Sequence, residues 1–259
     1  MAGTFDFSGK EVLVTGASSG IGLAVARGFA AAGANLAILA DRPEIYDAGK
    51  FLSAETGREV TVLCCDITDR EMVSRALSPL TRIDVLINNA GLELITPIDD
   101  RGTQIEETFR RIIDINVMGT YYVTRDALKV MPAGSSMVFT ASIWAKTAVA
   151  GFSAYCASKH ANLGFMRSLA QELGPRGINV NAVCPGFIRT DASMRSVTAE
   201  AVRSGRSEQD VTDELLANQA MPGLLEPDDV VNTYLFLASE HAKDIFGQSL
   251  HVDRGDVMD

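Results

Sequence analysis

The sequence predicts a single α/β domain in which helices cover both faces of a parallel sheet of seven strands. Short apolar runs rich in β-branched residues alternate with helical patterns along the chain, and parallel sheets are built from this alternation. The 259 residues are 47% hydrophobic, enough for one large core, and no internal repeat or linker divides them. The expected strands cover residues 11–15, 35–40, 60–65, 83–87, 136–142, 178–183 and 248–252.

A glycine-rich turn follows the first expected strand. Gly16, Gly20 and Gly22 lead into an alanine-rich helical stretch over residues 23–32, which Gly33 closes. Glycines let the backbone approach a pyrophosphate, and the free N–H groups at the start of a helix face its charge. In the order strand, glycine turn, helix, such a motif predicts a dinucleotide-binding Rossmann fold.

The end of the second strand bears on which dinucleotide binds. Asp41 stands there, about twenty residues beyond the glycines, where a carboxylate accepts hydrogen bonds from both ribose hydroxyls and repels a 2′-phosphate. Arg42 favours the opposite, because a guanidinium can pair with that phosphate. Since Asp41 has the expected position, the sequence favours NAD, with NADP as the alternative.

The third and fourth strands end in polar or small residues. Asp66 and Ile67 follow the third strand, and the run from Asn88 to Gly91 follows the fourth. Such residues suit close approach of a ligand, and alone they suit a plain turn equally well. A long helical pattern over residues 103–131 contains Asn116, a polar residue that by itself indicates either a cap or a kink.

Three residues supply the equipment for acid/base chemistry. Tyr155 and Lys159 are four positions apart in an expected helix that ends near residue 173, so they share one face. A phenol has a pKa of about 10, and a fixed cation nearby moves it towards the working range. Ser142 falls at the carboxyl end of the fifth strand, where ligands of open α/β sheets collect, and can hydrogen-bond the substrate oxygen. The set can oxidise an alcohol or reduce a carbonyl if a dinucleotide carries the hydride.

Residues 190–220 differ from the rest of the chain. They are charged and serine-rich, with helical pieces near residues 199–202 and 210–218, and a further helix is expected at 228–238. A polar insertion after a strand end is a candidate lid over the substrate, and an ordinary pair of surface helices fits equally well.

Composition excludes several classes of function. A net charge of −10 without a basic patch argues against nucleic acid or an anionic membrane as partner. The four cysteines and three histidines have no metal-ligand spacing, so no metal site is expected. The first six residues lack the pattern of a signal peptide, and no apolar run is long enough to span a membrane. We therefore expect a cytoplasmic protein.

Taken together, these motifs resemble those of the classical short-chain dehydrogenases/reductases over Lys10 to Gly255. The resemblance implies that Tyr155 is the general acid/base, that Ser142 binds the substrate oxygen, and that Lys159 lowers the Tyr155 pKa and binds the nicotinamide ribose. Asn116 would hold a water through its carbonyl at a helix distortion. The implied cofactor-binding residues are Gly16, Ser18, Ser19, Ile21 and Gly22 for the pyrophosphate, Asp41 for the ribose, Asp66 and Ile67 for the adenine, Asn88, Ala90 and Gly91 for the adenosine and ribose, and Pro185, Gly186, Ile188 and Thr190 for the nicotinamide end.

The resemblance also bears on assembly. Similar enzymes are usually tetramers that use the two long helices and the last strand, so a homotetramer is implied. The family's common Val-Asp-Gly-Gly ending reads Val252-Asp253-Arg254-Gly255 in this chain. Arg254 puts a long cation where a small residue is usual, which bears on the C-terminal packing and on one tetramer interface.

The substrate pocket is the least specific part of the sequence. Glu93, Trp144, Phe152 and Phe187 fall near the catalytic residues. A flat aromatic residue with a carboxylate suits a sugar or polyol, and the same apolar residues suit a ring ketone or an acyl chain. An NAD-dependent dehydrogenase of secondary alcohols or ketones is therefore predicted. The alternatives are an NADPH-dependent reductase of 3-oxoacyl thioesters and a dinucleotide-binding redox sensor without turnover.

Overall fold

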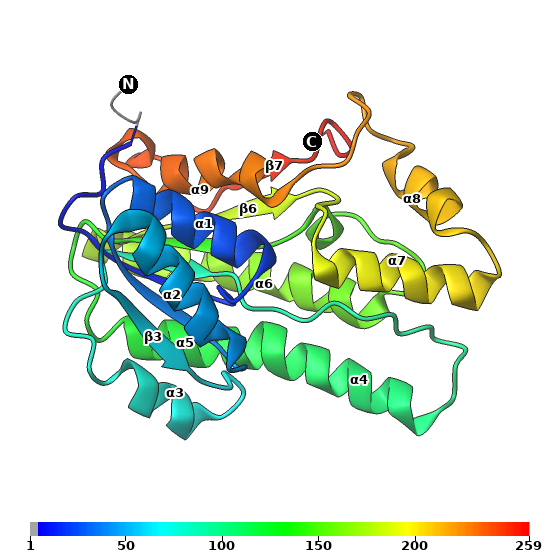
Figure 1. Ribbon diagram of the computed structural model, residues 1–259, viewed down its shortest axis with the longest axis horizontal. Helices are drawn as coiled ribbons and strands as arrows, with labels where there is room; N and C mark the ends of the chain where they lie inside the picture. Colours follow the sequence, from blue (N-terminus) through cyan, green and yellow to red (C-terminus); the bar gives the residue numbers. More distant parts are fainter. Residues whose placement is uncertain (1–4, 259) are drawn as a thin grey trace.

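Seven parallel strands form one sheet in the order β3-β2-β1-β4-β5-β6-β7 (Figure 1). The computed structural model describes residues 5–258, so part of the N-terminal segment that lacks a signal-peptide pattern lies outside the described residues. The strand order reverses between β1 and β4, and the crevice at such a reversal binds ligands in open α/β sheets. The strands are β1 (Glu11–Thr15), β2 (Asn35–Ala40), β3 (Val60–Cys64), β4 (Val85–Asn88), β5 (Ser136–Thr140), β6 (Asn179–Pro185) and β7 (Ser249–Val252).

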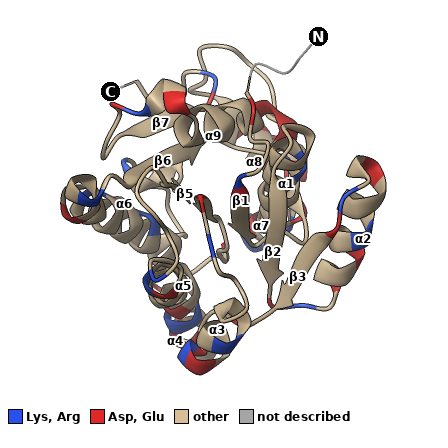
Figure 2. Cartoon of the chain, turned by 90° about the vertical axis from the view of Figure 1, so that its left-hand side faces the viewer, with Lys and Arg blue, Asp and Glu red and all other residues tan. Residues whose placement is uncertain are grey.

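Helices cover both faces of the sheet, as the alternation of patterns predicts. One apolar cluster joins a face of the sheet to α1 (Gly20–Ala31), α2 (Glu44–Thr56) and α9 (Val231–Ala238). A second cluster joins the other face to α3 (Arg70–Leu77), α5 (Thr120–Ala127) and α6 (Ser153–Leu173), with α4 (Thr103–Ile113) packed on α6. Figure 2 shows the charged residues on helices and loops, with both signs interspersed. No helix in the described part of the chain is long and apolar enough to cross a membrane.

The expected helix over residues 103–131 is interrupted. Between α4 and α5 the chain makes a wider, π-helical turn over Asp114–Gly119, and Asn116 is completely buried inside it. Such turns interrupt the regular hydrogen bonds of a helix and occur often at functional sites. The distortion implied by the family resemblance is therefore present.

Two further helices lie beyond the sheet, at the right-hand side of Figure 1. They are α7 (Asp191–Ser204), longer than the helical piece expected near residues 199–202, and α8 (Glu208–Leu216), which begins two residues before the piece expected near residues 210–218. Each begins with a capping box, formed by Thr190 and by Ser207. They share a small apolar cluster built on Phe187, Val197, Ala201 and Val211. The segment thus folds around its own core beside the sheet.

The C-terminal turn places Arg254 in a backbone conformation that favours glycine. Among the described non-glycine residues, Arg254 alone has a positive φ, of 57°. A glycine adopts this left-handed conformation freely, whereas a residue with a Cβ pays about 1 kcal/mol or more. The Arg254 carbonyl accepts a hydrogen bond from the Met221 N–H at 3.0 Å, which joins the turn to the segment after α8.

Candidate active site

The glycine turn has the geometry that a pyrophosphate requires. Gly16 and Gly20 have φ values of 65° and 54°, and a Cβ built on Gly22 would lie 2.2 Å from the Gly16 carbonyl oxygen. Ser19 precedes α1 without a side-chain cap, so no side chain occupies the N–H groups at the start of that helix. The backbone approach and the free N–H groups fit the phosphates of a dinucleotide.

Asn89 holds this turn against the neighbouring strands. Its amide nitrogen donates to the carbonyls of Thr15 at 3.0 Å and Gly16 at 3.2 Å. Its amide oxygen accepts from the Thr140 hydroxyl at 3.1 Å, and that hydroxyl lies 2.8 Å from the Tyr234 hydroxyl. Sequence reasoning did not assign this role to Asn89, because its partners lie far away in the sequence, on β1, in the glycine turn and on β5.

Three of the expected cofactor residues make contacts of their own. The Asp66 carboxylate accepts from the N–H and hydroxyl of Thr68 and pairs with Arg111 at 3.3 Å. The Asn88 amide donates to the Thr124 hydroxyl at 2.9 Å. Ile67 packs against Gly119, where a Cβ would come within 2.5 Å of the Ile67 side chain. Asp41 and Arg42 are both exposed at the end of β2.

Lys159 is buried directly behind Tyr155. Its ammonium donates to the Thr140 carbonyl at 2.7 Å and lies 5.5 Å from the centroid of the Tyr155 ring. Burial lowers the pKa of Lys159 from 10.5 to about 8, and Glu93 and then Cys184 act in the opposite direction. Lys159 therefore stands close to the point of losing its proton.

The Tyr155 pKa does not move in the direction that the sequence predicted. Burial raises the pKa of Tyr155 most, the Glu93 carboxylate raises it further, and the hydrogen bond from Ser142 lowers it. Lys159 does not produce the expected lowering of the Tyr155 pKa, and its ammonium donates to the Thr140 carbonyl at the end of β5. Tyr155 is thus protonated at neutral pH in this arrangement.

Asn116 fixes the chain beside this pair. Its side chain accepts from the Leu92 N–H at 2.7 Å and donates to the Leu92 carbonyl at 3.0 Å. It also donates to the Ser158 hydroxyl at 2.9 Å, which lies one residue before Lys159. Local sequence patterns do not predict that the Asn116 side chain binds the loop at Leu92.

One cavity of about 90 Å³ brings together two of the expected catalytic residues and five of the implied cofactor-binding residues. Ser142 and Tyr155 face the start of α1, the end of β6 and the two helices α7 and α8 across it. Ser193 and Leu215, from those two helices, were not anticipated. The lining residues are Ile21, Glu93, Thr140, Ala141, Ser142, Ile143, Trp144, Tyr155, Pro185, Gly186, Phe187, Ile188, Thr190, Ser193 and Leu215.

Three of the four expected substrate residues line this cavity. The Trp144 ring stands perpendicular to the Tyr155 ring, with centroids 6.0 Å apart. Phe152 is buried behind Trp144, at a centroid distance of 5.1 Å, and is not part of the lining. It supports the tryptophan instead of reaching a substrate. The remaining expected cofactor residues sit nearby: Ala90 lies against Gly16, and Gly91 lies beside Asn116 and Lys159.

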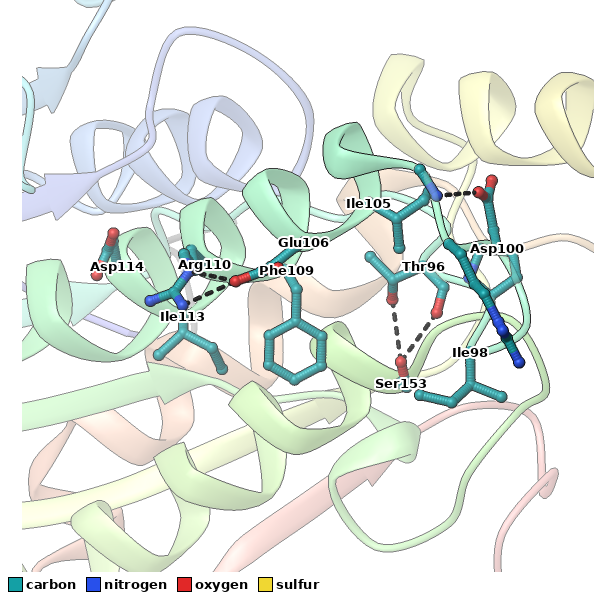
Figure 3. A pocket seen from close by; sticks show the side chains of 13 residues that line it. Thr96, Ile98, Asp100, Ile105, Glu106, Phe109, Arg110, Ile113, Asp114 and Ser153 are labelled. Carbon is teal, nitrogen blue, oxygen red and sulfur yellow. Dashed lines mark hydrogen bonds and ion pairs between the residues drawn. The ribbon is translucent and has the colours of Figure 1, made fainter.

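A larger cavity, of about 630 Å³, lies elsewhere (Figure 3). It follows the outer side of α4 and the loop before it, where Phe109 and Ile98 are exposed. Ser153 donates to the Thr96 carbonyl at 2.9 Å at its inner edge. None of the expected catalytic residues lines this cavity. Its size therefore does not make it the active site.

Comparison with known proteins agrees with the geometry. Residues 16–256 match the family model described as enoyl-(acyl carrier protein) reductase, a branch of the short-chain enzymes. This chain is a short-chain dehydrogenase/reductase. It is 32% identical to the 3-oxoacyl-[acyl-carrier-protein] reductase of Rickettsia bellii over 257 residues, 98% of this chain and 99% of that protein. It is 33% identical to the D-beta-hydroxybutyrate dehydrogenase of Cupriavidus necator, over 96% of this chain and 98% of that protein.

Solved structures of this oxidoreductase family superpose over the whole chain. The putative NAD(P)-dependent gluconate 5-dehydrogenase of Beutenbergia cavernae, with bound NADP, gives a TM-score of 0.85 at 29% identity and 98% coverage of both chains. L-sorbose reductase of Gluconobacter frateurii, complexed with NADPH and L-sorbose, gives 0.86 at 26% identity and the same coverage. The family confirms the nicotinamide cofactor in general terms, and these structures hold the phosphorylated form.

Proposed function

We propose that this short-chain dehydrogenase/reductase transfers a hydride between NAD(H) and a secondary alcohol or ketone, with a polyol or sugar as the substrate class. The observation that supports it most is the shared cavity, where Ser142 and Tyr155 face Ile21 of the glycine turn and Thr190 of the nicotinamide end. When bound, the dinucleotide supplies or accepts the hydride.

The chain's own residues handle the proton. The Ser142 hydroxyl donates a hydrogen bond to the substrate oxygen and orients the reacting carbon. The Tyr155 hydroxyl transfers a proton to that oxygen during reduction and takes it back during oxidation. Because burial and Glu93 raise the pKa of the Tyr155 phenol, the phenol carries at neutral pH the proton that reduction of a carbonyl consumes. Lys159 and Asn116 hold the positions of Tyr155 and of the loop at Leu92.

The choice between NAD and NADP depends on two adjacent side chains. Asp41 repels a 2′-phosphate, and Arg42 attracts one. The proposal of NAD follows from Asp41, whereas the NADP and NADPH in related structures support the alternative. Asp41→Ala should raise kcat/KM with NADP, and Arg42→Ala should lower it. If Asp41→Ala changes kcat/KM with neither NAD nor NADP, Asp41 does not discriminate between the two cofactors at the ribose.

A second candidate substrate is a 3-oxoacyl thioester, because several related proteins are 3-oxoacyl-[acyl-carrier-protein] reductases. The test measures oxidation of NADH and of NADPH with ketoses, small diketones and 3-oxoacyl thioesters, with Tyr155→Phe as the control. Tyr155→Phe should retain dinucleotide binding and lose turnover at least a hundredfold, since general acid catalysis contributes about 10²–10⁴. Undiminished turnover in that variant contradicts the mechanism. Thioester turnover with NADPH alone selects the second candidate.

The protein is further proposed to work as a homotetramer in the cytoplasm. Phe109, Met118 and Tyr121 are exposed apolar side chains on α4, the π-helical turn and α5, the helices that related enzymes use for assembly. Light scattering should give a mass near four chains, and Phe109→Asp should reduce it. A monomeric wild-type protein at micromolar concentration contradicts this proposal.

A further inference from the structure

Glu93 carries the one carboxyl group among the described residues that line the active-site cavity. The rest of the lining is apolar or carries hydroxyl groups. Glu93 is partly buried, and its carboxylate is close enough to Tyr155 and Lys159 to shift the pKa of both. An incoming substrate therefore meets a single carboxyl group beside the hydroxyls that are proposed to bind its reacting oxygen, and the Lys159 ammonium acts on that carboxyl group from α6.

The loop that carries Glu93 is fixed on both sides. Before it, the Asn116 side chain accepts a hydrogen bond from the Leu92 N–H and donates one to the Leu92 carbonyl. After it, the Thr96 N–H donates to the Gly151 carbonyl at 2.6 Å, and the Thr96 hydroxyl accepts from the Ala154 N–H at 3.1 Å. Since hydrogen bonds hold the chain one residue before and three residues after Glu93, the backbone at Glu93 cannot move away from the cavity without breaking them.

The charges that face Glu93 come from two helices. Burial raises the pKa of Glu93, while Ser196, Lys159 and Arg195 lower it. Lys159 and Tyr155 belong to α6, and the exposed Arg195 belongs to α7. The Lys159 ammonium is already bonded to the Thr140 carbonyl, and the Ser196 hydroxyl, although buried near the carboxylate, makes no hydrogen bond of good geometry. The carboxylate thus retains acceptor capacity towards a substrate.

We propose that Glu93 is a charge filter that restricts the substrate to neutral molecules bearing hydroxyl groups and rejects carboxylates and phosphates. The proposal rests on the proposed function and names the substrate class of the same site. An ionised carboxylate accepts hydrogen bonds from substrate hydroxyls. It repels a second anion within about 6 Å strongly enough to weaken binding on the order of ten- to a hundredfold in a partly buried site.

The filter can be read without turnover, because Trp144 is the single tryptophan of the chain and lies in the cavity. Its fluorescence is titrated, in the presence of reduced dinucleotide, which cannot accept a hydride from these alcohols, with two matched pairs of ligands. Sorbitol and gluconate differ in one terminal group, as do 3-hydroxybutyramide and 3-hydroxybutyrate. The variants are Glu93→Gln, nearly the same shape without the charge, and Asp99→Asn, the same change at an exposed position six residues further on.

The wild-type protein should bind the neutral member of a pair more tightly. Glu93→Gln should tighten binding of the anionic member at least tenfold relative to the neutral one, and Asp99→Asn should leave the ratio unchanged. A ratio that stays within twofold in Glu93→Gln, or failure to bind either pair, overturns the filter. The proposed function is judged separately, from turnover and its loss in Tyr155→Phe.

A measurement on the unmutated protein guards against a variant that folds poorly. Burial raises the pKa of Glu93, so its carboxylate gains a proton at a higher pH than an exposed glutamate does, and below about pH 7 Lys159, whose pKa is about 8, keeps its proton. Binding of gluconate relative to sorbitol should improve as the pH falls. A ratio that worsens or stays constant over this range contradicts the proposal.

Discussion

Removing the charge of Lys159 should stabilise the fold while it abolishes turnover. Lys159 is 3% exposed, and burial lowers its pKa from 10.5 to about 8. At about 1.4 kcal/mol for each pH unit, holding the ammonium in this site costs about 3 kcal/mol of folding free energy at neutral pH. Turnover should be lost because the proposed mechanism uses Lys159 to hold the position of Tyr155.

The variant Lys159→Met keeps an unbranched side chain and loses the charge. It also leaves the Thr140 carbonyl without its 2.7 Å partner, which costs about 1–2 kcal/mol. The net expectation is a gain of about 1–2 kcal/mol in the free energy of unfolding. For a chain of this length, that corresponds to a rise of a few degrees in Tm.

The pH dependence of this gain has a definite sign. The folded-state pKa of about 8 lies below the ordinary value of 10.5, so the folded protein loses the Lys159 proton first as the pH rises. The cost of burying the charge is fully present below about pH 8 and fades towards about pH 10.5. The advantage of Lys159→Met should therefore shrink between about pH 7 and about pH 10.

The assay is thermal unfolding of both proteins at equal concentration across this pH range, with turnover measured in parallel. Lys243→Met, at an exposed lysine, is the control and should change neither quantity. A Lys159→Met protein that melts below the wild type at neutral pH would refute the reasoning. A difference in Tm that does not depend on pH would show that the buried charge is not its origin.

Three further outcomes follow from particular contacts. Gly22→Ala places a Cβ 2.2 Å from a carbonyl oxygen of the glycine turn and should weaken dinucleotide binding at least tenfold by fluorescence titration, whereas Gly164→Ala, which meets open space, should not. Asn116→Ala leaves both backbone groups of Leu92 unpaired and should cost about 1–3 kcal/mol in denaturant unfolding. Burial alone would raise the pKa of Asp84, but hydrogen bonds from Arg82 and from a backbone N–H lower it on balance, so its stabilisation exists above its ordinary pKa and is lost as the pH falls through the lower folded-state value. The Tm difference between wild type and Asp84→Asn should accordingly vanish in acid.

Local sequence signals predicted the sheet well for a physical reason. Buried parallel strands are short apolar runs, and β1 and β2 begin and end where the expected runs do. The fifth strand is shorter than expected, because the chain leaves the sheet after Thr140 and Ser142 caps a short turn at Trp144. The Ser142 hydroxyl, which is proposed to bind the substrate oxygen, thus lies just beyond the strand, on a turn.

The interruption at Asn116 could not be located from periodicity. A π-helical turn adds one residue to a helix without changing which residue types are favourable there. Its cause lies 24 positions away, in the two backbone groups of Leu92 and in Ser158 of α6, which Asn116 can reach only when the helix widens. A side chain that satisfies three partners on two other elements is invisible to a local pattern.

The Tyr155–Lys159 spacing shows the same limit in the active site. A spacing of four residues on a helix makes the two side chains neighbours, and the sequence correctly placed them together. This spacing does not predict which acceptor the Lys159 ammonium binds. Because the end of β5 presents the Thr140 carbonyl, Lys159 bonds to the sheet, and the Tyr155 pKa is left to burial and to Glu93. Glu93, which raises the Tyr155 pKa after burial does, lies on the loop that follows β4. The pKa of Tyr155 therefore depends on how the sheet brings that loop to α6.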